Sequence, residues 1–241
     1  MSTSTASEAA KSSTRDLFLW TAGTPNGHKP SIFLEELKSA YPGFDYDYRG
    51  LVMTFKPDGV NEQKEPWFLK INPNGRIPAL TDKSKGDFQV FESAAILLYL
   101  EQHYDPENKF AFDPSSEWKD WSELQQWIFF AHGGVGPMQG QANHFNRAAP
   151  EKIPYAINRY LDETKRLYSV LDARLDGREY LAGPGKGKYT IADINVWPWV
   201  RIATIFTGFE SLNEWPHLNA WFERINARPA VQAGINIPPR K

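Results

Sequence analysis

The stretch TAGTPNGHKPS, residues 21–31, joins two segments of different periodicity. Before it, residues 17–20 (LFLW) form a short apolar run, which is typical of a buried strand. After it, Ile32, Phe33 and Leu37 recur at helical spacing, and Pro30 suits a first helical turn. The chain therefore passes from a strand into a helix here, as α/β folds do.

The segments that follow, up to about residue 105, continue this alternation of strand and helix patterns. They are a strand of period two (FDYDYRGLV, 44–52), a short helix ended by turn residues (EPWFLKINPNG, 65–75), two closely spaced strands (RIPALTD, 76–82, and FQVFES, 88–93) and an apolar helix (SAAILLYLEQHY, 93–104). The resulting order, β-α-β-α-β-β-α, predicts a small α/β sandwich with a mixed sheet over residues 16–105.

The second half of the chain has helical periodicity in every long segment. Residues 106–115 are richer in Pro, Asp and Asn and are expected to form a linker, and residues 116–241 are expected to form an all-helical domain. Within that domain the glycines and the proline of AHGGVGPMQGQANHF (131–145) predict a break or bend between Gly134 and Pro137. Residues 1–15 are small, polar and aperiodic, so a disordered tail is expected there.

Charge and cysteine content exclude several classes of function. The net charge of −2, from 27 Lys plus Arg and 29 Asp plus Glu, argues against a nucleic-acid partner. The absence of cysteine from the 241 residues excludes disulfides, thiolate metal sites and a protein thiol nucleophile, and fits a reducing cytosol. His132 and His144 lack partners for a metal site, so none is expected. Without an apolar signal core or a membrane-length apolar segment, we expect a cytoplasmic protein with no membrane partner.

The Asn26–Gly27 pair is the first candidate for chemistry. Such a pair is most often a turn, but a helix follows it here instead of a second hairpin strand. The amide of Asn26 and the free N–H groups of the first helical turn would then face one spot at the sheet edge, where an anion binds well. Asn26 can donate hydrogen bonds, and Thr24 offers a hydroxyl. Because the chain lacks cysteine, this loop can stabilise a thiolate that a ligand brings but cannot supply one.

Two motifs on the predicted sheet each have two interpretations. Pro78 in GRIPAL is either an edge-strand proline or a cis-proline turn whose neighbouring backbone faces a peptide ligand. Ser93 in FES either caps the next helix or, with Glu92, holds the ammonium and carboxylate of an amino acid end.

Aromatic and basic residues of the helical domain leave similar alternatives open. A bend near Gly134 could open an acceptor pocket for an electrophile, or the same side chains could be core; they are Trp127, Phe130, Met138, Phe145 and Trp197. Arg159 and Arg166 lie on one helix face and could bind a carboxylate or face solvent. The TIAD sequence at 190–193 has the form of a capping box and is interpreted as a folding element.

Three motifs in this order, GRIPAL, FESAAILLYL and TIADINVWPW, resemble the cytosolic glutathione transferase family from about residue 16 to the C-terminus. TPNGHK, NPNGRIPAL, GPMQGQANHF and IPYAINRY are similar to its YfcG-like (Nu-type) subgroup, which is related to a yeast nitrogen-catabolite regulator that is also a prion. The resemblance implies a thioredoxin-like N-terminal domain, an all-α C-terminal domain, a homodimer, and glutathione as co-substrate.

The resemblance also implies roles for individual residues. Asn26 matches the asparagine that faces the sulfur of glutathione, and Thr24 the nearby hydroxyl. The backbone of Ile77, before a cis Pro78, would pair with the cysteinyl part. Glu92 and Ser93 would hold the γ-glutamyl end, and Gln63 the glycyl end.

The function that the resemblance implies runs through the thiolate of glutathione. It is the reduction of disulfide or glutathionylated substrates and of hydroperoxides, with conjugation to a small hydrophobic substrate as a further activity. The alternative is a non-catalytic glutathione- or ligand-binding regulatory protein on the same fold. The prion behaviour of the yeast relative comes from an Asn/Gln-rich extension, whereas residues 1–15 here contain neither Asn nor Gln.

Overall fold

A four-stranded mixed sheet organises the N-terminal half of the chain, in a computed structural model that describes residues 14–54 and 59–239. The strands are β1 (Leu17–Thr21), β2 (Asp47–Gly50), β3 (Ala79–Asp82) and β4 (Phe88–Phe91), in the spatial order β2-β1-β3-β4. β2 runs parallel to β1, while β3 is antiparallel to both β1 and β4. The predicted mixed sheet is confirmed.

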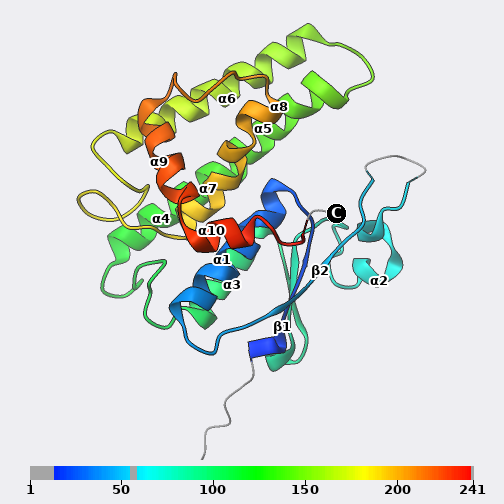
Figure 1. Cartoon of the computed structure of the whole chain (residues 1–241), viewed down its shortest axis with the longest axis vertical. Helices are drawn as coiled ribbons and strands as arrows, with labels where there is room; N and C mark the ends of the chain where they lie inside the picture. Colours follow the sequence, from blue (N-terminus) through cyan, green and yellow to red (C-terminus); the bar gives the residue numbers. More distant parts are fainter. Residues whose placement is uncertain (1–13, 55–58, 240–241) are drawn as a thin grey trace, which may run out of the picture.

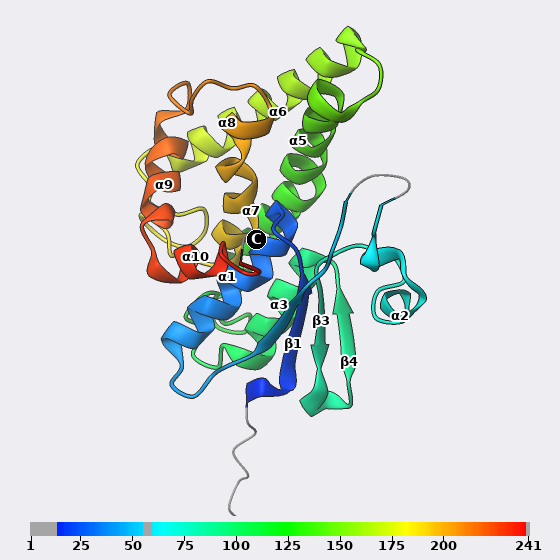
Figure 2. The ribbon, with the colours of Figure 1, turned by 45° about the vertical axis from the view of Figure 1, so that its right-hand side comes forward.

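Helices cover both faces of this sheet. α1 (Pro25–Ala40) connects β1 to β2, and α3 (Ser93–Tyr104) follows β4. Both lie on one face, and the short α2 (Pro66–Leu69) lies on the other (Figure 2). This arrangement is thioredoxin-like. Of the tail predicted to be disordered, residues 1–13 lie outside the described residues, and residues 14 and 15 belong to a 3-10 turn, η1 (Thr14–Asp16).

Nine helical segments of the described residues follow the sheet domain and α3, and they form the second domain (Figure 1). They are α4 (Trp118–Phe130), the π-helical η4 (Ala131–Val135), α5 (Gly136–Asn143), the π-helical η5 (His144–Ala148), α6 (Pro154–Leu175), α7 (Ile191–Arg201), α8 (Ala203–Phe206), α9 (Pro216–Asn226) and α10 (Pro229–Gly234), with a one-residue break at Ile202 between α7 and α8. The π-helical turn η4 overlaps the predicted break at Gly134 and Val135, but the chain stays helical through Gly136 and Pro137 into α5.

The predicted capping box starts α7, the central helix of this domain. The carboxylate of Asp193 accepts hydrogen bonds from the N–H of Thr190 at 3.0 Å and from the indole of Trp221 at 2.8 Å. Burial raises the pKa of Asp193 to about 6, against the lowering effect of these hydrogen bonds. Asp193 is fully buried and also accepts from the N–H of Leu181 at 3.1 Å, so it ties the start of α7 to its neighbours and TIAD acts as a folding element.

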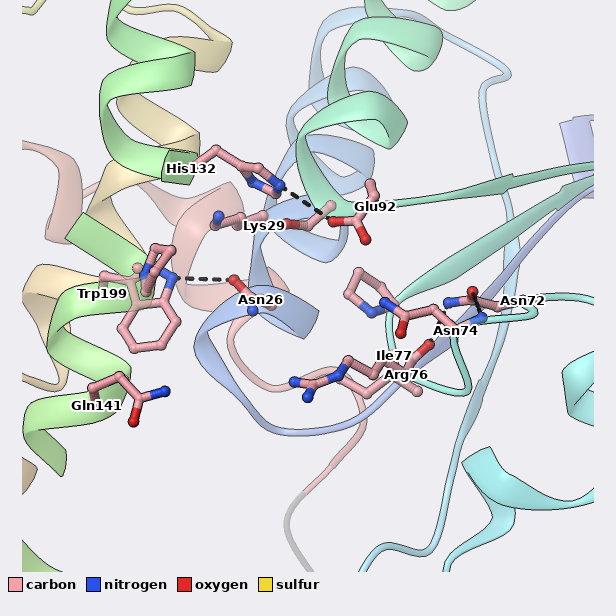
Figure 3. Close-up of a pocket in the computed structure, with 15 residues that line it drawn as sticks. Asn26, Lys29, Asn72, Asn74, Arg76, Ile77, Glu92, His132, Gln141 and Trp199 are labelled. Atoms are coloured by element: carbon pink, nitrogen blue, oxygen red, sulfur yellow. Dashed lines mark hydrogen bonds and ion pairs between the residues drawn. The ribbon is translucent and has the colours of Figure 1, made fainter. Parts of the chain in front are cut away.

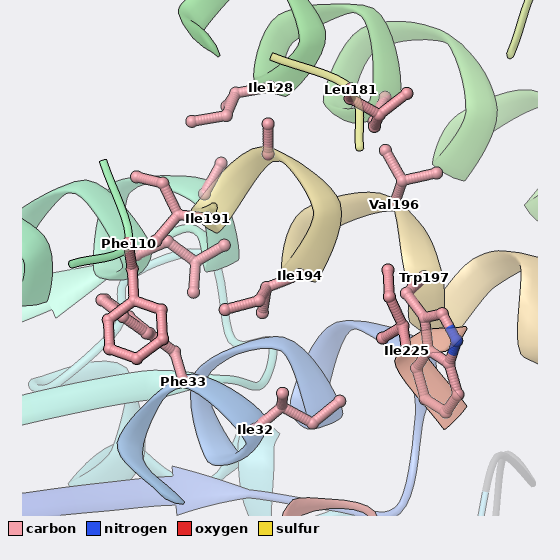
Figure 4. Close-up of a cluster of buried hydrophobic side chains, with 14 of the residues drawn as sticks. Ile32, Phe33, Phe110, Ile128, Leu181, Ile191, Ile194, Val196, Trp197 and Ile225 are labelled. Carbon is pink, nitrogen blue, oxygen red and sulfur yellow. The ribbon is translucent and has the colours of Figure 1, made fainter. Parts of the chain in front are cut away.

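The two domains share one hydrophobic core, and α1 lies in its middle. Ile32 and Phe33 of α1 face Ile191 and Ile194 of α7 in Figure 4, and all four are buried. Burying side chains of this size contributes about 1.5–3 kcal/mol each. The packing of the helical domain therefore fixes the position of α1, the helix that carries the TPNGHK motif.

A second set of contacts ties α1 to the C-terminal end of the chain. Ser31 donates to the carbonyl of Gly234 at 2.8 Å, and a Cβ on Gly234 would lie 2.5 Å from the Cα of Ile32, so α10 approaches α1 as closely as only glycine allows. Further along α1, Arg228 forms a bidentate pair with the buried Glu36 at 2.7 and 2.8 Å.

Candidate functional site

A cavity of about 620 Å³ lies where β1 passes into α1, between the sheet domain and the helical domain. Both domains contribute to its walls (Figure 3). The residues that line it are Asn26, Lys29, Asn72, Asn74, Arg76, Ile77, Pro78, Glu92, Ser93, His132, Gly136, Pro137, Gly140, Gln141 and Trp199. Most of these side chains are polar, so the cavity suits a charged or peptide-like ligand.

The start of α1 is held tightly against the end of β1. Thr24 is the N-cap of α1, and its hydroxyl accepts from the N–H of Gly27 at 3.1 Å. A Cβ on Gly27 would lie 2.1 Å from the carbonyl oxygen of Ala22, so this close approach requires glycine. The positive end of the helix dipole and the side chain of Asn26 are thereby placed at the cavity. Thr24 is not among the residues that line it.

Trp199, which the sequence analysis did not single out, fixes the orientation of the Asn26 amide. The indole Nε1 of Trp199 donates to Oδ1 of Asn26 at 3.1 Å (Figure 3). Because an indole N–H can only donate, it must bond the oxygen of the amide, and the two Nδ2 hydrogens remain for other acceptors. A Cβ on Gly136 would lie 3.0 Å from this indole nitrogen, so the glycine of α5 makes room for Trp199.

The loop before β3 forms the wall opposite α5. The Ile77–Pro78 bond is cis, as the resemblance implied, and both residues line the cavity. The buried side chain of Asn72 holds the loop: its amide donates to the carbonyl of Arg76 at 2.7 Å and accepts from the N–H of Asn74 at 3.0 Å. This places the guanidinium of Arg76 at the cavity rim, a role that the sequence analysis missed.

Glu92 has an unusual backbone at the start of α3. Its φ of +71° lies in the left-handed region, which is strained for a residue with a side chain and is most common at functional sites. Glu92 occupies the N-cap position without capping through its side chain, and Ser93 is the first helical residue, so the interpretation of Ser93 as a helix cap is wrong. The carboxylate of Glu92 lies 3.2 Å from Nε2 of His132, across the domain boundary.

Two basic side chains, Lys29 and His132, also line the cavity. Lys29 is only 1% exposed, and burial lowers its pKa to about 7 although Glu92 opposes the shift. Burial and the charge of Lys29 lower the pKa of His132, and Glu92 opposes this shift as well. A lysine in a helical sequence normally faces solvent, so the pattern NGHKPS gave no sign of its burial.

Trp197 does not line the cavity, and this prediction is wrong. Trp197 is fully buried, its ring stacks on Phe222, and its indole donates to the Phe222 carbonyl at 3.1 Å. Successive helix residues are about 100° apart around the axis, so Trp197 and Trp199 point in nearly opposite directions. The residue two positions later therefore takes the place that the prediction gave to Trp197.

The other residues of the predicted electrophile pocket are dispersed. Trp127 and Phe130 contact each other on α4, and Phe145 stacks on Tyr160. Met138, Arg159 and Arg166 line a separate cavity of about 730 Å³ beside α6, where Arg166 pairs with Glu163 at 2.8 Å. None of these predicted residues is among those that line the cavity at Asn26, and the expected aromatic wall is not formed there.

Gln63 is also not among the residues that line this cavity. It belongs to a 3-10 turn, η2 (Glu62–Lys64), and its amide donates to Oδ1 of Asn61 at 3.3 Å. Arg76, by contrast, does line the cavity.

Within the described ranges, 14–54 and 59–239, no cluster of three or more His, Cys, Asp or Glu residues has the arrangement of a metal site. Over the same part of the chain no helix has the length and apolar character needed to span a membrane.

A thioredoxin-like sheet domain, an all-helical domain, and between them a cavity built on a helix N-terminus and a cis-proline define the glutathione transferase class of proteins. The family models agree: "Glutathione S-transferase, N-terminal domain" matches residues 16–102, and "Glutathione S-transferase, C-terminal domain" matches residues 146–229. The chain belongs to the glutathione S-transferase family and, within it, is YfcG- and Ure2-like.

Individual relatives support this placement. The chain is 44% identical to the disulfide-bond oxidoreductase YfcG of Escherichia coli over 217 residues, which cover 88% of this chain and 91% of YfcG. A glutathione transferase homolog from Lodderomyces elongisporus, solved with two GSH per subunit, has a TM-score of 0.81 and 39% identity, covering 92% of this chain and 99% of that one. URE2P8 of Phanerochaete chrysosporium, solved with oxidized glutathione, has a TM-score of 0.81 and 34% identity; the match covers 95% of this chain and 96% of URE2P8.

Proposed function

We propose that this protein binds glutathione in the cavity at Asn26 and catalyses thiol–disulfide exchange through the glutathione thiolate. One observation carries the proposal: the amide of Asn26 presents donors at a helix N-terminus in a chain that has no cysteine. These donors suit a thiolate, and the sulfur must come from the ligand. The charge-assisted hydrogen bond and the helix dipole both lower the pKa of a bound thiol.

The polar residues of the cavity match the remaining groups of glutathione. The carboxylate of Glu92 suits the γ-glutamyl ammonium, while the hydroxyl and N–H of Ser93 suit its carboxylate. The backbone of Ile77, beside the cis-proline, suits the cysteinyl amide. Arg76, in place of Gln63, suits the glycyl carboxylate, and Thr24 acts indirectly by capping α1.

In the proposed reaction the glutathione thiolate attacks one sulfur of a disulfide, and the other sulfur leaves as a thiolate that takes up a proton. A second glutathione then attacks the mixed disulfide, which yields glutathione disulfide and the reduced substrate. Two similarities support this chemistry. YfcG is a disulfide-bond oxidoreductase, and the structural relatives were solved with GSH or oxidized glutathione bound. Attack of the same thiolate on a hydroperoxide would give a peroxidase activity.

The polar walls favour disulfides over small hydrophobic electrophiles. Trp199 and Pro137 are the large apolar side chains on the helical-domain side of the cavity, and the predicted aromatic wall is absent from it. We expect turnover of glutathione with hydroxyethyl disulfide to exceed turnover with an aryl halide, and an aryl glutathione conjugate to bind within about tenfold of glutathione itself, since little apolar surface is buried.

Steady-state assays with a disulfide, a hydroperoxide and an aryl halide test this proposal. Faster turnover of the aryl halide than of the disulfide would overturn it. Binding of glutathione without turnover of any of the three would favour the non-catalytic regulatory function. We further propose a cytoplasmic homodimer on the family resemblance, and light scattering after size-exclusion chromatography measures that oligomeric state.

A further inference from the structure

Lys29 is an ionisable residue of the cavity that the proposed binding contacts leave unused. It follows Asn26 by three positions on α1, so both side chains lie on one helix face about 5–6 Å apart at their Cβ atoms. Both line the cavity, and Figure 3 shows Lys29 in the part between Asn26 and the Glu92–His132 pair. Because Lys29 is only 1% exposed, its amine has lost most of its hydration and lies beside the ligand site.

The groups around Lys29 leave its charge only partly compensated. Glu92 favours the charged amine, but the carboxylate of Glu92 is also bonded to His132 at 3.2 Å. Arg76 lines the same cavity with a second positive charge. On the side of α1 packed against α10, the sequence PAVQAG contributes no titratable group. Lys29 therefore sits where a neutral amine is readily formed and where a new negative charge would favour protonation.

We propose that Lys29 accepts the proton of the glutathione thiol and returns it to the thiolate that leaves during disulfide exchange. The inference rests on the proposed function, because it names a further residue for that reaction. Asn26 donates hydrogen bonds to the sulfur but cannot take its proton. The hydroxyl of Thr24 caps α1, and His132 is engaged with Glu92.

The proton balance closes within the site. A thiol and a neutral amine become a thiolate and an ammonium, the thiolate attacks the disulfide, and the departing thiolate recovers the proton from the ammonium. A free thiol has a pKa near 8.5, and burial places the pKa of Lys29 at about 7, so transfer between the isolated groups is about thirtyfold unfavourable. Attraction between the thiolate and the new ammonium, at short range and out of water, offsets that factor.

The proposal predicts where the thiol proton goes when glutathione binds. Near pH 8, where Lys29 of the free protein is mostly neutral, wild type should form the thiolate while releasing close to zero protons to the medium. Lys29→Arg keeps the positive charge but cannot accept a proton, so it should form the thiolate and release about one proton per glutathione. Lys29→Met should form less thiolate than wild type and should release to the medium the proton of the thiolate that it does form. Lys38→Met, at the exposed end of the same helix, is the matched control and should behave as wild type.

Calorimetric titration with glutathione in two buffers of different ionisation enthalpy counts the protons, and ultraviolet absorbance reports the thiolate. Release of about one proton by wild type would overturn the proposal, as would thiolate formation without proton release in Lys29→Met. Loss of proton retention in His132→Gln with Lys29 intact would assign the proton to His132 instead. If Lys29→Met fails to fold, wild type and Lys29→Arg decide between these outcomes. Absence of binding heat in wild type would instead refute the proposed function.

Discussion

Replacing Asn26 by alanine removes the amide that the site offers to a bound thiolate. A hydrogen bond to a charged group contributes about 1.5–3 kcal/mol, which corresponds to about 10–150-fold in rate when it is lost. We therefore expect Asn26→Ala to lose at least about tenfold in turnover of a disulfide at saturating glutathione, and the pKa of bound glutathione to rise by about one unit or more. The fold should persist, because Asn26 lies in the first turn of α1, whose cap is Thr24.

Trp199 provides a sharper test, because it acts on the sulfur only through Asn26. Trp199→Phe deletes the 3.1 Å hydrogen bond to Oδ1 and leaves the amide free to rotate. A neutral hydrogen bond contributes about 0.5–1.5 kcal/mol, so the expected loss in turnover is about two- to tenfold. In the Asn26→Ala background the same substitution should cost almost nothing, since there is no amide left to orient. Trp215→Phe, whose indole bonds Ser169 away from the cavity, is the control.

Single-turnover kinetics and thiolate absorbance, measured on the four members of this cycle, give the coupling energy directly. Equal costs of Trp199→Phe in both backgrounds would mean that the indole contacts the ligand independently of Asn26. Full activity of Asn26→Ala with saturating glutathione would refute the assignment of the sulfur site to the start of α1.

The remaining predictions concern ligand binding and stability. Glu92→Gln and Ser93→Ala should raise the KM for glutathione about tenfold or more with a smaller change in kcat, because they hold a part of the ligand that does not react; unchanged affinity in both would remove them from the site. The pKa of Lys29 falls from 10.5 in the unfolded chain to about 7 in the folded protein, so the unfolded state binds more protons between these pH values. The unfolding free energy should therefore rise with pH across that window, by as much as about 5 kcal/mol. Urea titrations of ligand-free wild type and Lys29→Met measure this rise, which the variant should lack. Arg228→Ala should lower the unfolding free energy by about 3–5 kcal/mol because it leaves the buried Glu36 unpaired. Replacing both Arg228 and Glu36 by methionine should recover part of that loss. Equal losses in the two variants would argue against a stabilising role for the ion pair.

Periodicity and local chemistry predicted most of the helices and strands. The predicted helix 93–104 coincides with α3, the predicted all-helical domain contains α4 and α6, and the break predicted between Gly134 and Pro137 overlaps the end of the π-helical η4. These features depend on residues near one another in the chain, and such signals are legible in a single sequence. The cis geometry at Pro78 came from the resemblance alone, because local chemistry favours trans.

The residues that complete the cavity were harder to predict because their roles depend on packing between the domains. Trp197 and Trp199 are equivalent in a hydrophobicity pattern, and only the rotation of α7 against α1 and α5 decides which of them reaches Asn26. Lys29 is buried because the helical domain covers α1, which no local pattern reveals. His132 meets Glu92 across 40 positions of sequence, so neither residue predicts the other.

The way in which α1 is held explains how the amide of one asparagine could stabilise the thiolate of a bound ligand. A donor lowers the energy of a thiolate most when it is already in position and needs no reorganisation. α1 is bonded to β1 through the hydroxyl of Thr21, which donates to the carbonyl of Gly27, and to α10 through Ser31 and Gly234. Asn26 itself is bonded to α7 through Trp199. The sheet domain alone could not supply the last two of these restraints, although it carries Asn26. It follows that the helical domain serves the proposed chemistry by fixing the donor as well as by enclosing the substrate, and that loosening the contact of α10 with α1 should weaken thiolate stabilisation without touching any residue of the cavity.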